Sequence, residues 1–227
     1  RQTDTFEGRL PELDTLTAWL DDEDSRHCLV FGDGGYGKTT TVLELLNQYI
    51  EGGIDLNRPP PEIISYHTAK MTKWTEQGLT RLNTVSKTVD QFIRELMKCF
   101  NEVLPSEWYK VSGRALLDKA VNKLKDEGYT RDEVLLVLDN TETLATKQNE
   151  VVDLGNLFKD IGKRLGRVII TSRRREIIEA RPIAIEGLTE IDSVHLMQRL
   201  AIEYKAESIN KAGESTLRKV SKKLMRK

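Results

Sequence analysis

The stretch GDGGYGKTT, residues Gly32–Thr40, decides the fold expected for this chain of 227 residues. It matches the pattern G-x-x-x-x-G-K-[ST] at every specified position, with a strand-like apolar run before it and an amphipathic helical pattern after it. Glycines let the backbone curl so that successive N–H groups face phosphate oxygens, and the N-terminus of the following helix adds positive potential. The stretch therefore predicts a phosphate-binding loop, and a glycine turn that binds nothing is the alternative.

The spacing within the loop assigns a task to each part of it. Lys38 is expected to reach the β- and γ-phosphates and to assist catalysis there, and the hydroxyl of Thr39 is expected to join the shell of a Mg²⁺ ion. The residues expected to contact the nucleotide in this stretch are Gly32, Asp33, Gly34, Gly35, Tyr36, Gly37, Lys38, Thr39 and Thr40.

The loop by itself selects neither the base nor the reaction. A guanine site usually carries [NT]KxD after a later strand, and the nearest string, TKQN at Thr146–Asn149, lacks the aspartate. Small-molecule kinases usually carry an arginine-rich lid, and only the run Arg173–Arg175 keeps that interpretation open. Adenine is therefore favoured over guanine.

Short apolar runs alternate with longer helical patterns along the chain, which predicts an α/β fold with a parallel sheet. The expected strands are His27–Phe31, Glu62–His67, Glu133–Asp139, Arg167–Ser172 and Arg181–Gly187. Helices are expected over Pro11–Leu20, from the glycine loop to Ile50, over Gly113–Glu127, over Val151–Arg164 and from Thr189 onward.

The section between the second strand and the next helix is less regular. Thr68–Lys87 is polar and weakly periodic, so we expect a surface insertion or a mobile loop there. Thr88 and Gln91 form a plausible capping box, which predicts a helix that continues through Phe100 and Val103.

The strand Val134–Leu138 leads directly to Asp139. A carboxylate at the end of a strand that follows a phosphate loop is expected to help hold Mg²⁺, although it can also merely cap its own loop. The next residue, Asn140, cannot take up a proton, so it cannot serve as a general base. Glu142 is the nearest carboxylate that can orient and deprotonate water, and an exposed loop acid is its alternative role.

Basic residues follow the fourth expected strand in the stretch VIITSRRR. Arg173 is expected to approach a γ-phosphate and so to distinguish ATP from ADP, because the additional charged oxygens give it a partner. Arg174 and Arg175 are expected to form a solvated basic loop.

Composition excludes several other classes of protein. The net charge of −1 gives no global field toward nucleic acid or membrane, and no stretch approaches the ~20 apolar residues of a membrane span. No signal peptide is visible, and Cys28 and Cys99 are expected to be buried free thiols, which suits a reducing cytoplasm. Because the chain starts at Arg1 and stops in a basic helical stretch, we expect it to be a piece of a longer protein.

Together these motifs resemble the STAND class of signal-transduction ATPases, which contains the NB-ARC and NACHT modules. The resemblance covers about Phe6–Ala201. It implies an α/β P-loop NTPase of the ASCE/AAA+-like type, with a central parallel five-stranded sheet flanked by helices and followed by a helical subdomain. The matching stretches, in family order, are FEGRLPELDTLTAWL (Phe6–Leu20), GDGGYGKTT, LLVLDNTE (Leu135–Glu142) and VIITSR (Val168–Arg173).

The resemblance also implies domain limits and site residues. Residues 1–188 would form the nucleotide-binding domain, with a first segment over 1–25, and residues 189–227 the start of the helical subdomain. Phe6, Gly8 and Arg9 would contact the base or ribose, while Lys38, Thr39, Asp139 and Arg173 would serve the phosphates and metal and Glu142 would be the candidate base. Two departures stand out: Asn140 interrupts the usual run of acids, and no Gly-x-Pro adenine contact is visible.

The function implied is a switch that binds ATP or ADP with Mg²⁺, hydrolyses ATP slowly and self-associates through its nucleotide-binding domain. Sensor and effector domains would lie elsewhere in the same protein, and antiviral defence is one setting for such a switch. The alternatives are a mechanical AAA+ ATPase acting on nucleic acid or protein, and a nucleotide-binding scaffold without hydrolysis. Trp19, Trp74 and Trp108 lack surrounding basic residues in a pattern typical of nucleic-acid binding, so nucleic acid is disfavoured as a partner but not excluded.

Overall fold

The computed structural model describes residues 6–69, 72–75, 78–81, 85–143, 148–175 and 179–225. The chain divides into two compact units. The first unit comprises Arg1–Ala18, Gly32–Asp55 and Ala184–Lys227, and the second comprises Trp19–Phe31 and Leu56–Ile183. The beginning of the predicted first segment, residues 1–5, and half of the string TKQN, residues 146–147, lie outside the described residues.

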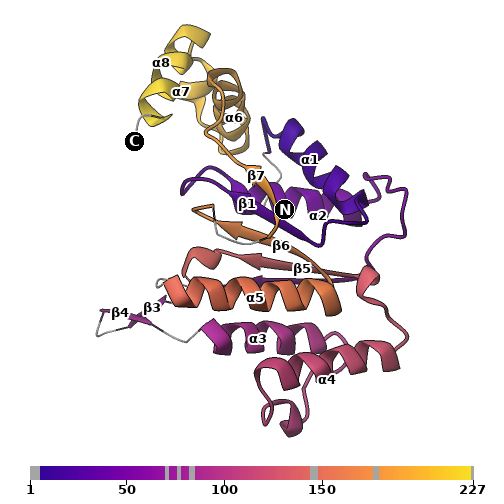
Figure 1. Cartoon of the computed structure of the whole chain (residues 1–227). Coiled ribbons are helices and arrows are strands. Elements are labelled where there is room, and N and C mark those ends of the chain that lie inside the picture. Colours follow the sequence, from indigo (N-terminus) through magenta and orange to yellow (C-terminus); the bar gives the residue numbers. More distant parts are fainter. Residues whose placement is uncertain are drawn as a thin grey trace. The chain divides into compact units, whose positions relative to one another are not determined.

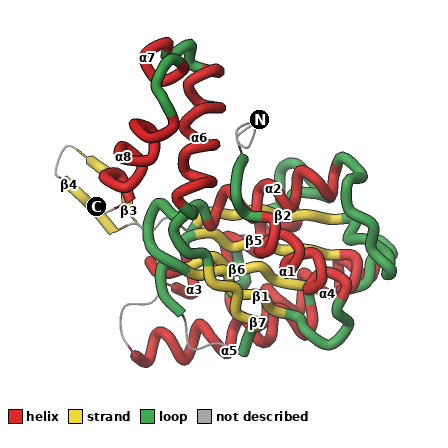
Figure 2. The backbone as a smooth tube through the Cα atoms, turned by 90° about the horizontal axis from the view of Figure 1, so that it is seen from above, coloured by secondary structure: helices red, strands yellow, loops and turns green. Residues whose placement is uncertain are grey.

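A five-stranded sheet in the order β2-β5-β6-β1-β7 is the centre of the second unit (Figures 1 and 2). The pairs β2–β5, β5–β6 and β1–β6 are parallel, as predicted. The fifth strand ends three residues earlier than expected, at Ala184. The strands are β1 (His27–Phe31), β2 (Ile63–Thr68), β5 (Val134–Asp139), β6 (Arg167–Ser172) and β7 (Arg181–Ala184).

The central strands are continuous apolar runs because both of their faces are covered. Every residue of β5 and of β6 is buried. One face packs on α3 (Val85–Met97), α4 (Gly113–Asp126) and α5 (Gln148–Arg164), seen together in Figure 1. Large contributors to this core are Phe92, Leu117, Leu136, Phe158 and Ile170.

The bounds of α3 correct the sequence-based expectation. The helix begins at Val85, so Thr88 is a buried residue within it rather than its cap. It ends at Met97, where the N–H of Phe100 donates to the Met97 carbonyl at 3.1 Å, an i→i−3 bond that closes the last turn. Phe100 and Val103 therefore lie beyond the helix, and Val103 is exposed.

The stretch predicted as a surface insertion or mobile loop contains an antiparallel hairpin, β3 (Thr72–Thr75) with β4 (Gly78–Arg81), which forms a sheet of its own. The regular strands were not predicted, but a hairpin outside the main sheet does not contradict an insertion. Trp74 pairs with Leu79 in its register. Thr and Trp favour extended backbone, and this local preference is independent of the weak hydrophobic pattern on which the expectation rested.

The two cysteines are both free, but they differ in exposure. Cys28 lies in β1 and is buried, and burial raises the pKa of its thiol to about 12. Cys99 is exposed, which corrects the expectation of a buried thiol, because α3 has already ended at Met97.

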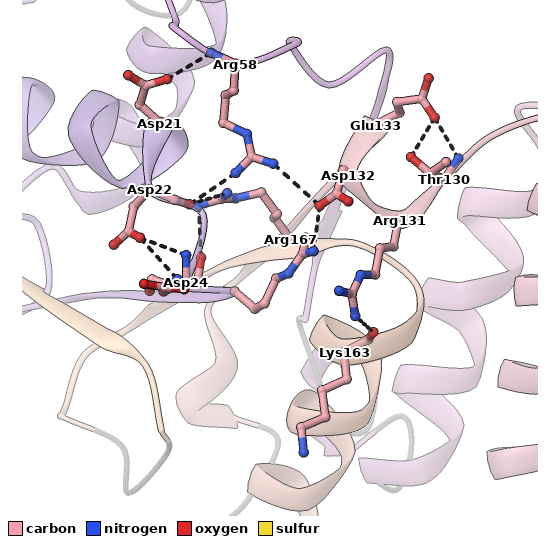
Figure 3. A network of polar contacts seen from close by, with 12 residues as sticks. Asp21, Asp22, Asp24, Arg58, Thr130, Arg131, Asp132, Glu133, Lys163 and Arg167 are labelled. Carbon is pink, nitrogen blue, oxygen red and sulfur yellow. Dashed lines mark hydrogen bonds and ion pairs between the residues drawn. The ribbon is translucent and has the colours of Figure 1, made fainter.

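A buried arginine ties the start of β6 to the segment that follows the first helix (Figure 3). Arg167, only 2% exposed, donates to the carbonyls of Asp22 at 2.6 Å and Ser25 at 2.9 Å and to that of Trp19. Its guanidinium also lies over the Trp19 ring, 4.7 Å from the centroid. Burial lowers the pKa of Arg167 to about 10, which still leaves the side chain charged at neutral pH.

The first unit holds the glycine loop and the C-terminal helices. Thr189 caps α6 by accepting from the N–H of Asp192 at 3.1 Å, so the helix begins where the sequence predicts. Lys222 pairs with Glu190 at 3.0 Å and links α8 to α6.

Within the described residues, no helix is both long and apolar enough to span a membrane. The remaining helices are α1 (Leu10–Asp21), α2 (Lys38–Ile50), α6 (Glu190–Glu203), α7 (Glu207–Asn210) and α8 (Glu214–Met225), with 3-10 turns η1 (Ser106–Trp108), η2 (Arg131–Glu133) and η3 (Thr141–Thr143).

Candidate functional site

The glycine loop begins at Gly32, the residue directly after β1, and ends where α2 starts at Lys38. Gly35 and Gly37 have φ values of +85° and +89°, a left-handed conformation that side chains with a Cβ rarely adopt. A Cβ added at either residue would meet no described atom within 4 Å. The loop therefore turns back on itself, leaves open space beside these glycines and directs the chain into a helix N-terminus, the arrangement that binds phosphate.

Gly32 is needed for another reason. A Cβ at this position would lie 2.0 Å from the carbonyl oxygen of Ile185. The backbone after β7 thus packs directly on the first residue of the loop, and any larger residue would separate the two segments.

Lys38 already has its ammonium group over the loop. Its Nζ donates to the carbonyls of Gly32 at 2.8 Å and Asp33 at 2.9 Å, and the side chain is buried. Thr39 follows as the second residue of α2, at the positive end of that helix. The loop therefore presents a cation and a helix N-terminus, both of which favour an anionic ligand.

The predicted base-contacting residues form a structured turn in the first unit. The Arg9 guanidinium donates to the carbonyls of Tyr36 at 2.9 Å and Glu186 at 2.5 Å, and it pairs with Glu12 at 2.8 Å. Arg9 thereby ties the turn to the glycine loop through the Tyr36 carbonyl. These contacts occupy the guanidinium, so its observed role is to hold backbone in place.

The same turn is attached to α6. Arg199 donates to the Phe6 carbonyl at 3.0 Å and pairs with Glu7 at 2.7 Å. Gly8 lies against Asp192 so closely that a Cβ would be 2.5 Å from the Asp192 Cγ. The first segment, the glycine loop and α6 are thus joined within the first unit.

In the second unit, Asp139 ends β5 and is 3% exposed. The Thr171 hydroxyl donates to its Oδ1 at 2.5 Å, and the Asn140 side-chain amide donates to its Oδ2 at 2.7 Å. The Asn140 backbone N–H donates to the same Thr171 hydroxyl at 3.0 Å. Tyr66 lies nearby on β2, where burial raises the pKa of its phenol and the charge of Asp139 adds to that rise.

Asn140 has a structural role that the sequence did not reveal. Its φ is +61°, in the left-handed region that asparagine tolerates better than most residues with a side chain. The chemistry of its side chain alone marks Asn140 only as a residue that cannot accept a proton. An asparagine directly after a strand is a recognisable signal for a left-handed turn, and it points to this geometry.

Glu142 lies in η3 and faces the residues after β6 instead of solvent. Its carboxylate pairs with Arg173 Nε at 3.0 Å and accepts from the Arg173 backbone N–H at 3.2 Å. Arg174 donates to the Glu142 carbonyl at 3.2 Å. The Glu142 side chain is 10% exposed and that of Arg173 is 66% exposed, so the candidate base is covered while its partner faces water.

The Asp139 cluster is chemically suited to Mg²⁺, which prefers carboxylate and hydroxyl oxygens and is usually bound by one or two carboxylates together with phosphates. Both Asp139 oxygens accept hydrogen bonds, which hold the carboxylate in one orientation. Among the residues that the structure describes, no group of three or more His, Cys, Asp or Glu side chains is placed to hold a metal ion.

No family model and no curated protein matches the sequence. The fold is similar to that of a Walker-type ATPase of Pyrococcus abyssi, with a TM-score of 0.56 and 15% identity over 94% of this chain and 62% of that one. It is also similar to Cdc6p of Pyrobaculum aerophilum (TM-score 0.56, 16% identity, 94% of this chain and 54% of that one).

The Orc1 protein of Aeropyrum pernix, solved in complex with DNA, is similar with a TM-score of 0.54 and 17% identity over 87% of this chain and 50% of that one. The chain therefore spans between half and about three fifths of the length of these proteins. Likeness at such low identity shows the fold alone. The predicted α/β fold, a central five-stranded sheet flanked by helices whose pairs β2–β5, β5–β6 and β1–β6 are parallel, is confirmed.

Proposed function

We propose that this chain is the ATP-binding and slowly ATP-hydrolysing module of an AAA+-type protein. The observation that carries the proposal is the glycine loop, in which left-handed Gly35 and Gly37, the Lys38 ammonium and the start of α2 create a site for a polyphosphate. The fold is the one in which such a loop serves a nucleoside triphosphate.

Adenine is the proposed base, because the sequence lacks a guanine-reading string after its third strand. Phe6, Gly8 and Arg9 are the proposed neighbours of the base or ribose. Their turn is held against the glycine loop by the contact from Arg9 to the Tyr36 carbonyl, which supports a place near the nucleotide.

The proposed division of labour follows from the chemistry of each side chain. Lys38 would neutralise charge on the β- and γ-phosphates, and Thr39 and Asp139 would provide oxygens for Mg²⁺. Mg²⁺, when bound, supplies positive charge to the phosphate oxygens. Glu142 would orient the attacking water and accept its proton. Arg173 would bind the γ-phosphate and so distinguish ATP from ADP.

Slow hydrolysis is proposed because the Glu142 carboxylate is already bound to Arg173. Its carboxylate is paired with Arg173 and accepts a backbone N–H, so it must exchange these partners before it can act as a base. A γ-phosphate would compete for Arg173, and this competition would link release of Glu142 to the presence of ATP.

A second candidate is a STAND-type switch, with the nucleotide-binding domain over residues 1–188 and the helical subdomain from residue 189. It is favoured by the contacts of α6 with the first segment, where Arg199 holds Phe6 and Glu7 and Asp192 abuts Gly8. Such contacts would let a nucleotide held near the first segment bias the position of α6. Self-association, sensor and effector domains of a longer protein, and a setting such as antiviral defence belong to this candidate.

The AAA+ proposal places the module in a machine that acts on nucleic acid or protein. The similarity of its fold to that of a protein solved with DNA makes nucleic acid the first substrate to test. A cytoplasmic location would suit either candidate.

The decisive experiment is nucleotide binding by Lys38→Ala. We expect the affinity for ATP to fall at least about 100-fold, because each hydrogen bond to a charged group contributes about 1.5–3 kcal/mol and Lys38 would make more than one. Calorimetric titration measures this, and Lys211→Ala, which removes an exposed lysine that pairs with Glu207, is the matched control. Wild-type affinity in Lys38→Ala would sink the assignment of the phosphate loop.

A further inference from the structure

The carboxylate of Asp139 is held by a different donor on each oxygen. Oδ1 accepts from the Thr171 hydroxyl at 2.5 Å and Oδ2 accepts from the Asn140 amide at 2.7 Å. Both donors are side chains, one from the next residue and one from the neighbouring strand β6. Together they fix the plane of the carboxylate, which a single contact would leave free to rotate.

The Thr171 hydroxyl both donates and accepts a hydrogen bond within this cluster. It donates to Asp139 and accepts from the Asn140 backbone N–H at 3.0 Å, so it uses its proton and a lone pair on the same cluster. Thr171 is buried, and its carbonyl accepts from the buried Thr141 hydroxyl at 3.1 Å. The hydroxyl therefore connects the turn after β5 to the carboxylate at the end of β5.

Asn140 combines two properties that few residues share. Its backbone is left-handed, with φ at +61°, and its side chain carries N–H donors. Aspartate tolerates this backbone but cannot donate to Asp139, and it would place a second negative charge beside the first. Glycine would keep the backbone and lose the donor.

The backbone of Asp139 does not depend on these side chains. Asp139 pairs with Thr68 in the register of β2 and β5, and its carbonyl accepts from the Ala69 N–H at 2.7 Å. The strand thus fixes where Asp139 stands, while Asn140 and Thr171 fix how its carboxylate is turned.

We propose that Asn140 and Thr171 are positioning residues that hold the Asp139 carboxylate in the orientation with which it would serve the Mg²⁺ of the proposed nucleotide. The inference rests on the proposed nucleotide-binding function. Second partners that orient a ligating carboxylate contribute strongly to metal affinity, and their loss typically costs 10–100-fold. This assigns a use to the asparagine that stands where a second acid is common.

The test is the gain in ADP affinity that Mg²⁺ provides, measured by calorimetric titration of ADP in Mg²⁺ and in EDTA. Asn140→Gly should bind ADP in EDTA as wild type does, but its gain from Mg²⁺ should be about tenfold smaller.

Two further variants separate orientation from folding. Thr171→Val removes the hydroxyl at nearly constant volume and should also reduce the gain from Mg²⁺, whereas Thr171→Ser keeps the hydroxyl and should restore it. Thermal unfolding of each variant checks that the fold is retained, and the Asn140→Gly result stands independently if Thr171→Val unfolds.

The outcomes divide clearly. An unchanged gain from Mg²⁺ in Asn140→Gly would overturn the inference, and so would an equal loss with and without Mg²⁺, which would show a role in folding alone. A wild-type protein that binds ADP without any gain from Mg²⁺ would refute the proposed metal assignment of Asp139, and the inference would fall with it.

Discussion

At the scale of single residues, the pairing of Glu142 with Arg173 changes how both are understood. The sequence proposes one as a base and the other as a phosphate sensor, each with its own task. The structure joins them at 3.0 Å, with Glu142 covered and Arg173 largely exposed. Glu142 must therefore leave Arg173 before its carboxylate can contact a water molecule.

Glu142→Gln therefore tests whether this carboxylate acts at all. We expect single-turnover ATP hydrolysis to slow at least about 100-fold, the usual contribution of a general base, while ATP affinity stays close to that of wild type. Glu133→Gln, which alters an acid that caps the turn η2, is the control and should hydrolyse ATP normally. Equal rates in Glu142→Gln and wild type would remove Glu142 from the catalytic role.

At the scale of elements, Arg167 shows how the sheet is joined to its flanking segment. Its guanidinium satisfies the carbonyls of Trp19, Asp22 and Ser25, which lie at and after the end of α1. Around it, Arg26 and Arg58 share Asp132 at 2.5 and 3.5 Å (Figure 3 shows Arg58 reaching Asp132). This network anchors the start of β6.

Arg167→Met should destabilise the fold by about 1–3 kcal/mol, because the Ser25 carbonyl loses its donor. The Trp19 and Asp22 carbonyls would keep the Asp22 N–H and Arg58 as donors. Urea unfolding followed by circular dichroism measures this loss. Arg164→Met, which breaks a partly exposed pair with Asp118, is the control and should cost no more than about 1 kcal/mol. Similar small losses in both variants would contradict the anchoring role.

At the scale of the whole molecule, the two candidate functions differ in what ATP changes. A switch needs ATP and ADP to favour different states, whereas a motor needs turnover that responds to its substrate. The contacts of α6 with the first segment suit the first candidate.

We expect ATP turnover to rise when single-stranded DNA or an unfolded protein is added, as the AAA+ proposal requires. Steady-state phosphate release measures this, and Lys38→Ala provides the background. Unchanged turnover, together with assembly in a non-hydrolysable ATP analogue but not in ADP by analytical ultracentrifugation, would favour the STAND-type switch instead.

The sequence by itself determined the glycine loop, the five strands and the position of Asp139. A contiguous motif specifies the loop, and apolar runs of strand length specify the sheet, so both signals lie within a few neighbouring residues. The ends of the helices were harder to predict from the sequence. The helix α3 ends at Met97, although apolar residues continue beyond it in the sequence. The hairpin β3–β4 was missed because its backbone preference is not accompanied by a clear hydrophobic pattern.

Only the tertiary structure decided how the candidate site residues are used. Asn140 meets Thr171, and Glu142 meets Arg173, across 31 residues of chain in each case. Arg9 reaches a carbonyl 177 residues away. These partners are set by the order of the strands and by the path of the chain after β7, because parallel strands bring distant residues to one edge of a sheet. No local pattern contains that information, so the residues were predictable and their pairing was not.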